Sequence, residues 1–173
     1  MLAALLVALS SDVHGAVAVG AGTGYGFAGT RLELSVGPIG LSAAAGMIAS
    51  SSGDAEWATG RWRSTPGLPL ALAARFMPGI DGGPFVALSA AWFPYSYPTD
   101  DGHRTLHGDR YSLTVTGGYR FGFTRHIFGE LAIGSGAARA VDPGPTSYLG
   151  TIGPPRHGIE FQPDGAAAVG LRF

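Results

Sequence analysis

A chain of 173 residues with a formal net charge of −1 is long enough for one domain and has no charge excess that would indicate a nucleic-acid partner. Charged residues make up only 13% of it, against about a quarter in soluble proteins. Yet no apolar run approaches the roughly 18 residues that cross a bilayer as a helix. Low charge without such a run favours a β-barrel, and the absence of cysteine excludes disulfides and cysteine-based metal or redox sites.

Residues 1–15 form a candidate signal peptide. The apolar run from Leu2 to Leu9 has the length of a signal core and is too short to span a membrane. Residues 13–15 offer a cleavage site, so the mature domain is predicted to cover residues 16–173. The positively charged region expected before the apolar run is lacking, which leaves a buried N-terminal segment as the alternative.

Alternation of apolar residues with a period of two predicts three strands in the first third of the chain. The first runs from residue 16 to about 26, with Thr23 and Tyr25 on the same face as its valines. A connection at 27–30 leads to a second strand at 31–36, and Gly37-Pro38 suits a type II′ hairpin turn into a third strand at 39–47. Pairing Val36 with Ile39 across this turn places both apolar faces on one side.

Five more strands are predicted after an aperiodic loop at 49–67. They cover residues 68–77, 85–93, 111–123, 127–133 and 164–173, with long loops at about 95–109 and 141–162. The stretch YSLTVTGGYRFGF at 111–123 alternates throughout, which is long for a soluble strand and typical of one that spans a membrane. The pattern predicts an all-β fold, a closed antiparallel eight-stranded transmembrane β-barrel.

The hairpin formed by the sixth and seventh predicted strands has a strongly specified register. Along an antiparallel hairpin, the residue numbers of every opposed pair add to the same sum. Because Arg120 and Glu130 must both face inward, this sum must be even. The tightest turn that satisfies this is the three-residue segment 124–126. It places Arg120 directly opposite Glu130.

The last strand carries a terminal motif in which Val169, Leu171 and Phe173 alternate up to the C-terminus. It resembles the signal that the barrel assembly machinery of Gram-negative bacteria reads. With the strand schedule, residues 16–173 resemble small outer-membrane proteins of the OmpA-membrane-domain, OmpX and OmpW type. The resemblance implies a monomer in the bacterial outer membrane with both termini in the periplasm. It also implies contact with outer-membrane lipid and lipopolysaccharide, with the assembly machinery as a partner.

Aromatic residues are predicted to form two belts at the membrane interfaces. One belt lies at the end of the barrel with short turns, and the other at the end with long loops. The predicted members are Phe76, Phe85, Phe121 and Phe123 at the turn end, and Tyr25, Trp92, Tyr95 and Tyr111 at the loop end. The alternative is that these aromatics form the core of a soluble β-sandwich.

Four inward charges, Glu33, Arg75, Arg120 and Glu130, are predicted to lie at similar depth in the turn-side half of the lumen. The interior of an eight-stranded barrel is just wide enough to be filled by side chains, and buried charges persist only when paired. The pattern favours a structural ion-pair network that plugs the lumen. A gated path for ions or protons through this layer is the alternative.

Other polar residues suggest weaker hypotheses. The loop with Asp100, Asp101, His103, His107 and Asp109 has metal-ligating residue types but no defined geometry, so a solvated loop is favoured and no metal or cofactor is expected. Arg139, Arg156 and His157 have the chemistry to contact lipopolysaccharide phosphates. The resemblance also includes lipid A deacylases, but His126 is followed by Ile127 and Phe128, so the serine of their His-x-Ser arrangement is missing.

The sequence thus predicts a non-enzymatic integral outer-membrane β-barrel with long extracellular loops. Its expected role is structural, in envelope integrity, or in surface interactions. A narrow channel for small or apolar solutes is the alternative, and a lipid A-modifying enzyme is a lower one.

Overall fold

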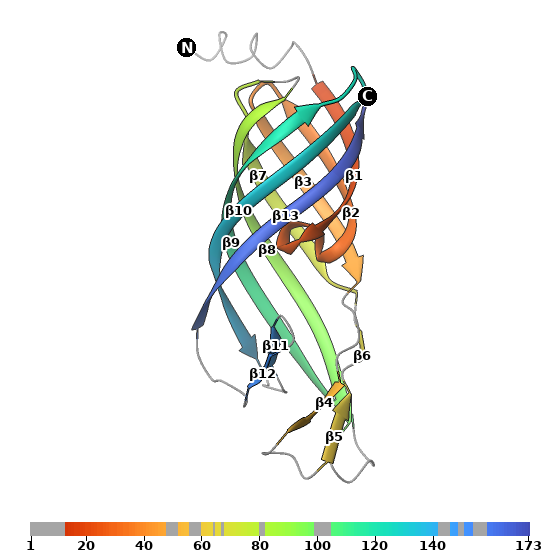
Figure 1. The fold of residues 1–173 in the computed structure, drawn as a ribbon, viewed down its shortest axis with the longest axis vertical. Coiled ribbons are helices and arrows are strands. Elements are labelled where there is room, and N and C mark those ends of the chain that lie inside the picture. The colour runs from red at the N-terminus through yellow and green to blue at the C-terminus, as the bar shows by residue number, and fades with distance from the viewer. Residues whose placement is uncertain are drawn as a thin grey trace.

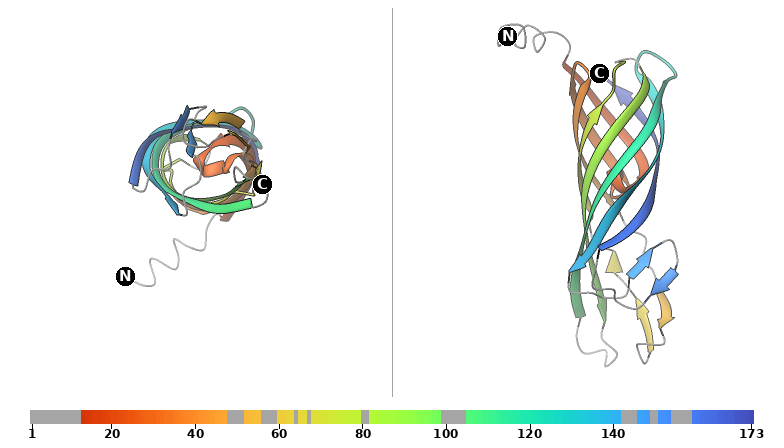
Figure 2. Two further views of the ribbon diagram at one scale, coloured as in Figure 1. Left: turned by 90° about the horizontal axis from the view of Figure 1, so that it is seen from below. Right: turned by 90° about the vertical axis from the view of Figure 1, so that its left-hand side faces the viewer.

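The computed structural model describes residues 13–47, 52–55, 60–63, 65–66, 68–79, 82–98, 105–141, 146–148, 151–153 and 159–173. The chain is a closed antiparallel barrel of eight strands (Figures 1 and 2). The wall strands are β1 (Val13–Gly22), β2 (Phe27–Val36), β3 (Ile39–Met47), β7 (Leu70–Phe76), β8 (Gly83–Pro98), β9 (Thr105–Gly122), β10 (Ile127–Val141) and β13 (Ile159–Arg172). They pair in the order β8-β7-β3-β2-β1-β13-β10-β9, and the β8–β9 pairing closes the ring.

Shorter elements lie at the end of the barrel away from the C-terminus (Figure 1). They are β4 (Ser52–Ala55), β5 (Gly60–Arg63), β6 (Thr65–Pro66), β11 (Thr146–Tyr148) and β12 (Thr151–Gly153). Strands β4 and β5 form one hairpin, β11 and β12 another, and β6 pairs with β8. A single 3-10 turn, η1 (Thr23–Tyr25), links β1 to β2. The described part of the chain has no helix that is long and apolar enough to cross a membrane.

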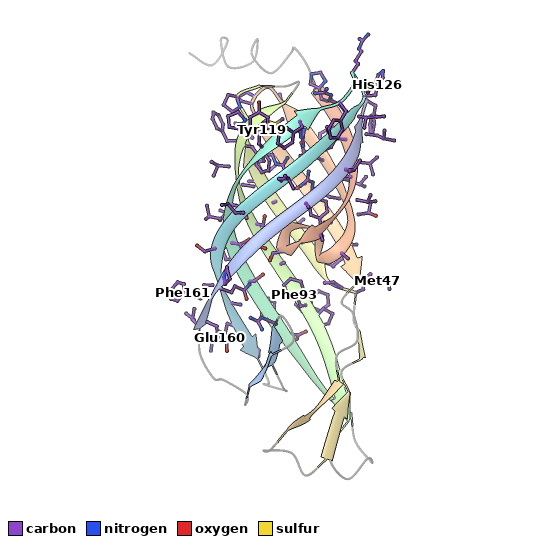
Figure 3. All side chains as sticks on the ribbon, viewed as in Figure 1. Met47, Phe93, Tyr119, His126, Glu160 and Phe161 are labelled. Atoms are coloured by element: carbon purple, nitrogen blue, oxygen red, sulfur yellow. The ribbon has the colours of Figure 1, made fainter. Side chains whose placement is uncertain are left out.

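The wall has an apolar outside and an inside of small, polar and aromatic residues. Strands alternate between exposed and buried positions because successive side chains point to opposite faces. Large apolar side chains such as Leu72, Val115 and Ile133 are exposed on the outside. Figure 3 shows Phe161 and Met47 projecting from opposite sides of the barrel. The alternation predicted from the sequence is therefore confirmed, with the apolar face outward.

The predicted pairings are confirmed where the hairpins are tight. Val36 lies opposite Ile39, and Gly37 has a φ of 57°, as the first central position of the predicted turn requires. Arg120 lies opposite Glu130 across β9 and β10. At the C-terminus, Phe173 and Gly15 exchange two backbone hydrogen bonds of 2.9 and 3.0 Å, which continue the pairing of β13 with β1. Residues 13–15 of the predicted signal peptide therefore lie within β1, while the signal itself stays a prediction.

The first connection differs from its prediction. β1 ends at Gly22, the chain turns inward through η1, and the predicted connection at 27–30 lies within β2. Gly22 and Gly26 have φ angles of 125° and 63°, which side chains rarely adopt, so these two glycines permit the chain to leave and rejoin the wall. Tyr25 consequently points into the lumen and is only 1% exposed, and its predicted place in an outer belt is wrong.

Four wall strands, β8, β9, β10 and β13, are longer than predicted. β8 extends to Pro98, β9 begins at Thr105, β10 ends at Val141 and β13 begins at Ile159, so the predicted loops at 95–109 and 141–162 are shorter. Part of the predicted loop at 49–67 also forms strands, as β4 to β6. Backbone hydrogen bonds continue to pair these strands beyond the apolar band. The side chains there no longer alternate between apolar and polar, so the sequence pattern did not predict the extra length.

Inward glycines make room for the aromatic rings in the lumen. A methyl group added to Gly118 would come within 2.6 Å of the Phe85 ring, and one added to Gly170 would collide with the Phe128 ring. Phe85 and Phe128 are 4% and 0% exposed. The glycines of these strands are thus part of the packing of a narrow interior.

We expect Gly170→Val to lower the free energy of unfolding by about 1 to 3 kcal/mol, because a branched side chain would displace the buried Phe128 ring. Gly165→Val is the matched control on the same strand, since a methyl group there meets only the Ala132 carbonyl oxygen, at 3.7 Å. Urea unfolding of both variants, refolded in detergent, measures the difference. Equal losses would contradict the packing role of Gly170.

Candidate functional site

Five charged side chains meet inside the turn-side half of the barrel. Arg31 and Glu33 come from β2, Arg75 from β7, Arg120 from β9 and Glu130 from β10. All five are buried, and Arg120 is only 2% exposed. Each occupies an inward position of its strand, so the alternation of the wall turns all five side chains into the lumen.

Glu130 is the centre of this ion-pair layer. Its Oε2 atom accepts hydrogen bonds from Arg31 Nη2 at 2.8 Å and Arg75 Nη2 at 3.1 Å. Its Oε1 atom accepts from Arg120 Nε at 2.6 Å and also from Arg75 Nη1. The Tyr25 hydroxyl donates to Oε2 at 3.3 Å. One carboxylate thus receives bonds from three arginines on three different strands and from the inward 3-10 turn.

Glu33 completes the layer from the opposite side. Arg120 Nη2 lies 2.8 and 2.9 Å from its two carboxylate oxygens. Arg31 Nη2 and Arg75 Nη1 lie 3.2 and 3.5 Å from its Oε2 atom. Because the planar guanidinium presents five donors, each arginine contacts both carboxylates at once.

Each arginine of the layer also stacks on an aromatic ring. The guanidinium carbon of Arg31 lies 4.6 Å from the centre of the Tyr25 ring. The corresponding distances are 4.0 Å for Arg75 over Phe85 and 4.3 Å for Arg120 over Phe128. Cation–π contacts supply attraction on the faces where a guanidinium forms no hydrogen bonds. Five charged groups and three rings therefore fill the cross-section together.

A second polar group lies nearer the loop end. Arg110 on β9 lies 2.8 Å from the Gln162 side-chain oxygen and 3.4 Å from the Glu160 carboxylate, both on β13. Ala44, Ala71, Ala91 and Phe93 form a buried apolar cluster, in which Phe93 lies directly opposite Arg110 and Ala44 directly opposite Arg31. The interior is thus occupied by side chains at successive depths.

A small cavity of about 20 Å³ adjoins the ion-pair layer. Arg31, Glu130 and Asp164 are among its lining residues, and Asp164 accepts a hydrogen bond of 3.0 Å from the Thr23 hydroxyl. Such a volume holds about one water molecule. The Nε atom of Arg31 is buried and has no hydrogen-bond partner among the described residues.

The structure brings the four predicted charges, Glu33, Arg75, Arg120 and Glu130, together as predicted. Sequence analysis missed Arg31 as a member, although it lies two residues before Glu33 and so faces the same side of the strand. Phe85 was predicted in the turn-end belt, and this is wrong because its ring lies inside under Arg75. Tyr25 also belongs to the layer instead of the loop-end belt.

The other predicted belt residues whose side chains the structure describes face outward. Phe76, Phe121 and Phe123 are exposed at the turn end, Tyr111 is exposed at the loop end, and Trp92 is partly exposed there. The Tyr95 side chain lies outside the described residues, although its backbone pairs with Gly108. Val169, Leu171 and Phe173 also point outward, so the last strand presents a continuous apolar face.

The residues of the hypothetical metal loop are only partly described. Asp100, Asp101 and His103 lie outside the described residues, and of His107 only the backbone is placed. Asp109 accepts a hydrogen bond of 2.8 Å from Trp92 Nε1. Within the described ranges there is no group of three residues of metal-ligating type. At the opposite end, His126 Nδ1 lies 3.2 Å from the Arg172 carbonyl oxygen.

Comparisons with known proteins do not identify a family. Neither the models of known protein families nor the curated protein sequences contain a match to this chain. The barrel shape alone does not identify a family, so membership in one of the outer-membrane families that the sequence resembles stays a prediction.

We expect Glu130→Gln to lower the free energy of unfolding by about 3 to 5 kcal/mol, because the neutral amide leaves three buried arginines with Glu33 as their one remaining carboxylate in the layer. Glu160→Gln is the matched control, since the Glu160 side chain is 28% exposed and contacts Arg110 at 3.4 Å. Its cost should stay below about 1 kcal/mol. Urea unfolding of the refolded variants measures both, and similar costs would refute the central role of Glu130.

Proposed function

We propose that this protein is an integral outer-membrane barrel with a sealed lumen, which contributes to envelope integrity and presents its loop end for surface contacts. The observation that carries the proposal is the ion-pair layer, because it fills the lumen of a barrel whose outside is apolar. An apolar outside does not suit a soluble domain, and a filled lumen does not suit an open pore. The function is non-enzymatic, and the contacts are made by the outer surface.

The outer face supports a membrane location. Large apolar side chains are exposed on all eight wall strands. A soluble monomer rarely exposes a contiguous apolar patch of more than a few hundred square ångströms, whereas a lipid-embedded barrel requires an apolar band around its circumference. The outward rings of Phe76, Phe121 and Phe123 at one end and of Trp92 and Tyr111 at the other fit interfacial belts.

The interior supports a sealed barrel over a channel. The guanidinium groups of Arg75 and Arg120 are held between two carboxylates and an aromatic ring each. Moving such groups aside would leave buried charges without partners, which costs several kilocalories per mole. The adjoining cavity of about 20 Å³ has no room for a hydrated ion.

The length of β8 and β9 supports a role for the loop end in surface contacts. These strands have 16 and 18 residues, whereas the hairpin of β1 and β2 has 10 residues in each strand. The β8–β9 hairpin and the small β4–β5 hairpin therefore extend well beyond the rest of the wall (Figure 1). Such projecting hairpins suit contacts with partners outside the membrane.

The proposal is tested by expressing the chain in a Gram-negative host and recording three properties. We expect it to fractionate with outer membranes, to change its gel mobility on heating, and to give no stepwise current in planar bilayers. The double variant Arg75→Ala/Glu130→Ala removes one cation and one anion from the layer. Current from this variant alone would identify the layer as the seal, whereas current from the unaltered protein would favour the narrow channel. A soluble, heat-insensitive product would refute the membrane location.

We expect Phe173→Ala to reduce the assembled protein in the outer membrane several-fold, because Phe173 ends the apolar face proposed to be read during assembly. Phe123→Ala is the matched control: both rings are exposed at the turn end and pack over a glycine, Gly15 for Phe173 and Gly129 for Phe123. Since the substitution keeps the two backbone hydrogen bonds to Gly15, closure of the ring is preserved. Immunoblots of outer-membrane fractions measure both, and equal levels would argue against a terminal signal.

A further inference from the structure

We propose that the outer wall carries a binding site for one phosphorylated, multiply acylated glycolipid of the lipid A type, with a phosphate on Arg139 and acyl chains in the groove beside it. The inference rests on the proposed outer-membrane location, in which the loop end faces the leaflet that contains this lipid. It assigns a specific partner to a surface that otherwise would meet lipid without preference.

The groove is an apolar depression of about 500 Å³ that crosses β7, β8, β9, β10 and β13. Its lining includes Leu70, Leu72, Leu113 and Ile159, and almost all of it is hydrocarbon. Ala90 and Ala137 lie directly opposite Leu113 on the two neighbouring strands. These two alanines lower the surface on both sides of Leu113, which leaves space for acyl chains. The volume falls within the range of small-molecule sites.

A row of residues with polar groups borders the groove toward the loop end. Trp92, Tyr111 and Arg139 are neighbours on β8, β9 and β10, because Trp92 pairs with Tyr111 and Tyr111 with Arg139. All three also line the groove. The hydrogen bond from Trp92 Nε1 to Asp109 fixes the orientation of the indole. Aromatic residues of this kind lie at the level of lipid head groups, so Arg139 lies where a phosphate would be.

Arg139 differs from the arginines of the lumen. Arg31, Arg75, Arg110 and Arg120 each contact a carboxylate. Arg139 is exposed on the outside, and no carboxylate of the described residues forms an ion pair with it. Asp109, on the same face, accepts the bond from Trp92. The exposed Arg139 side chain thus lies at the edge of an apolar surface. Phosphate oxygens match guanidinium donors in charge and geometry.

A second groove on the wall provides an internal comparison. It has a similar volume of about 490 Å³ and lies near the turn end, where Phe121, Phe123 and Ala167 are among its lining residues. No arginine lines it. An apolar groove bordered by a cation that pairs with no described carboxylate therefore distinguishes the loop-end groove from a depression of similar size on the same barrel.

The test uses the full chain refolded in detergent micelles that contain equal amounts of diphosphoryl lipid A and phosphatidylglycerol, followed by native mass spectrometry. We expect one lipid A molecule to remain bound to the unaltered barrel. Arg139→Gln should weaken retention by at least about tenfold, which is the loss expected for a charge-assisted hydrogen bond. Ala137→Phe, which fills the groove and keeps the cation, should weaken it as well.

Two control variants match these changes outside the site. Arg125→Gln removes an exposed arginine in the turn at the opposite end, and Ala167→Phe fills the second groove. Both should retain lipid A as the unaltered protein does. Equal retention by all variants, or preferential retention of phosphatidylglycerol, would overturn the inference. A barrel that shifts in gel mobility on heating but retains no lipid would refute this inference alone, whereas failure to fold in micelles would refute the proposed membrane function.

Discussion

The Glu130 carboxylate, buried and bonded to three arginines, is the interaction on which the rest of the barrel depends. A buried carboxylate is tolerated only with cationic partners, and here they come from β2, β7 and β9 while Glu130 itself lies on β10. In the ring, β9 and β10 are neighbours, whereas β7 and β2 are separated from them and from each other by strands that contribute no charge to the layer. The layer therefore links opposite sides of the wall through the lumen, in addition to the hydrogen-bonded ladders that link neighbours. A one-residue slip of any of these four strands would turn a charge outward and leave its partners unpaired.

The many glycines and alanines of the chain are a consequence of this crowded interior. Three arginines and three aromatic rings in one cross-section need small neighbours, and Gly118 and Gly170 lie against the rings of Phe85 and Phe128. On the outside, glycine has a related use, since the Phe173 and Phe123 rings cover Gly15 and Gly129. Residues that would weaken a strand in a soluble sheet thus allow close packing on both faces of a narrow barrel.

The ion-pair layer inside the barrel and the proposed outer groove have the same physical basis. A charged side chain at an apolar surface requires an oppositely charged partner, and inside the barrel the protein supplies it. On the outer wall Arg139 finds no carboxylate among the described residues, so the proposed partner comes from the membrane. The side chains in the lumen therefore stabilise the barrel. The proposed contacts with lipid and with partners outside the membrane are made by the outer wall and the loop end.

The sequence by itself determined which residues share a face and how many strands cross the wall, because side chains alternate strictly along a strand. It also determined the pairing of Arg120 with Glu130, since two inward charges and a short turn leave one close register. Only the tertiary structure decided the depth at which side chains from distant strands meet. Arg31 joins the layer because β2 faces β10 across the lumen, and Tyr25 joins it because the chain turns inward between Gly22 and Gly26. Alternation describes a strand relative to its neighbours, whereas contacts across a closed lumen depend on the curvature and stagger of the whole ring.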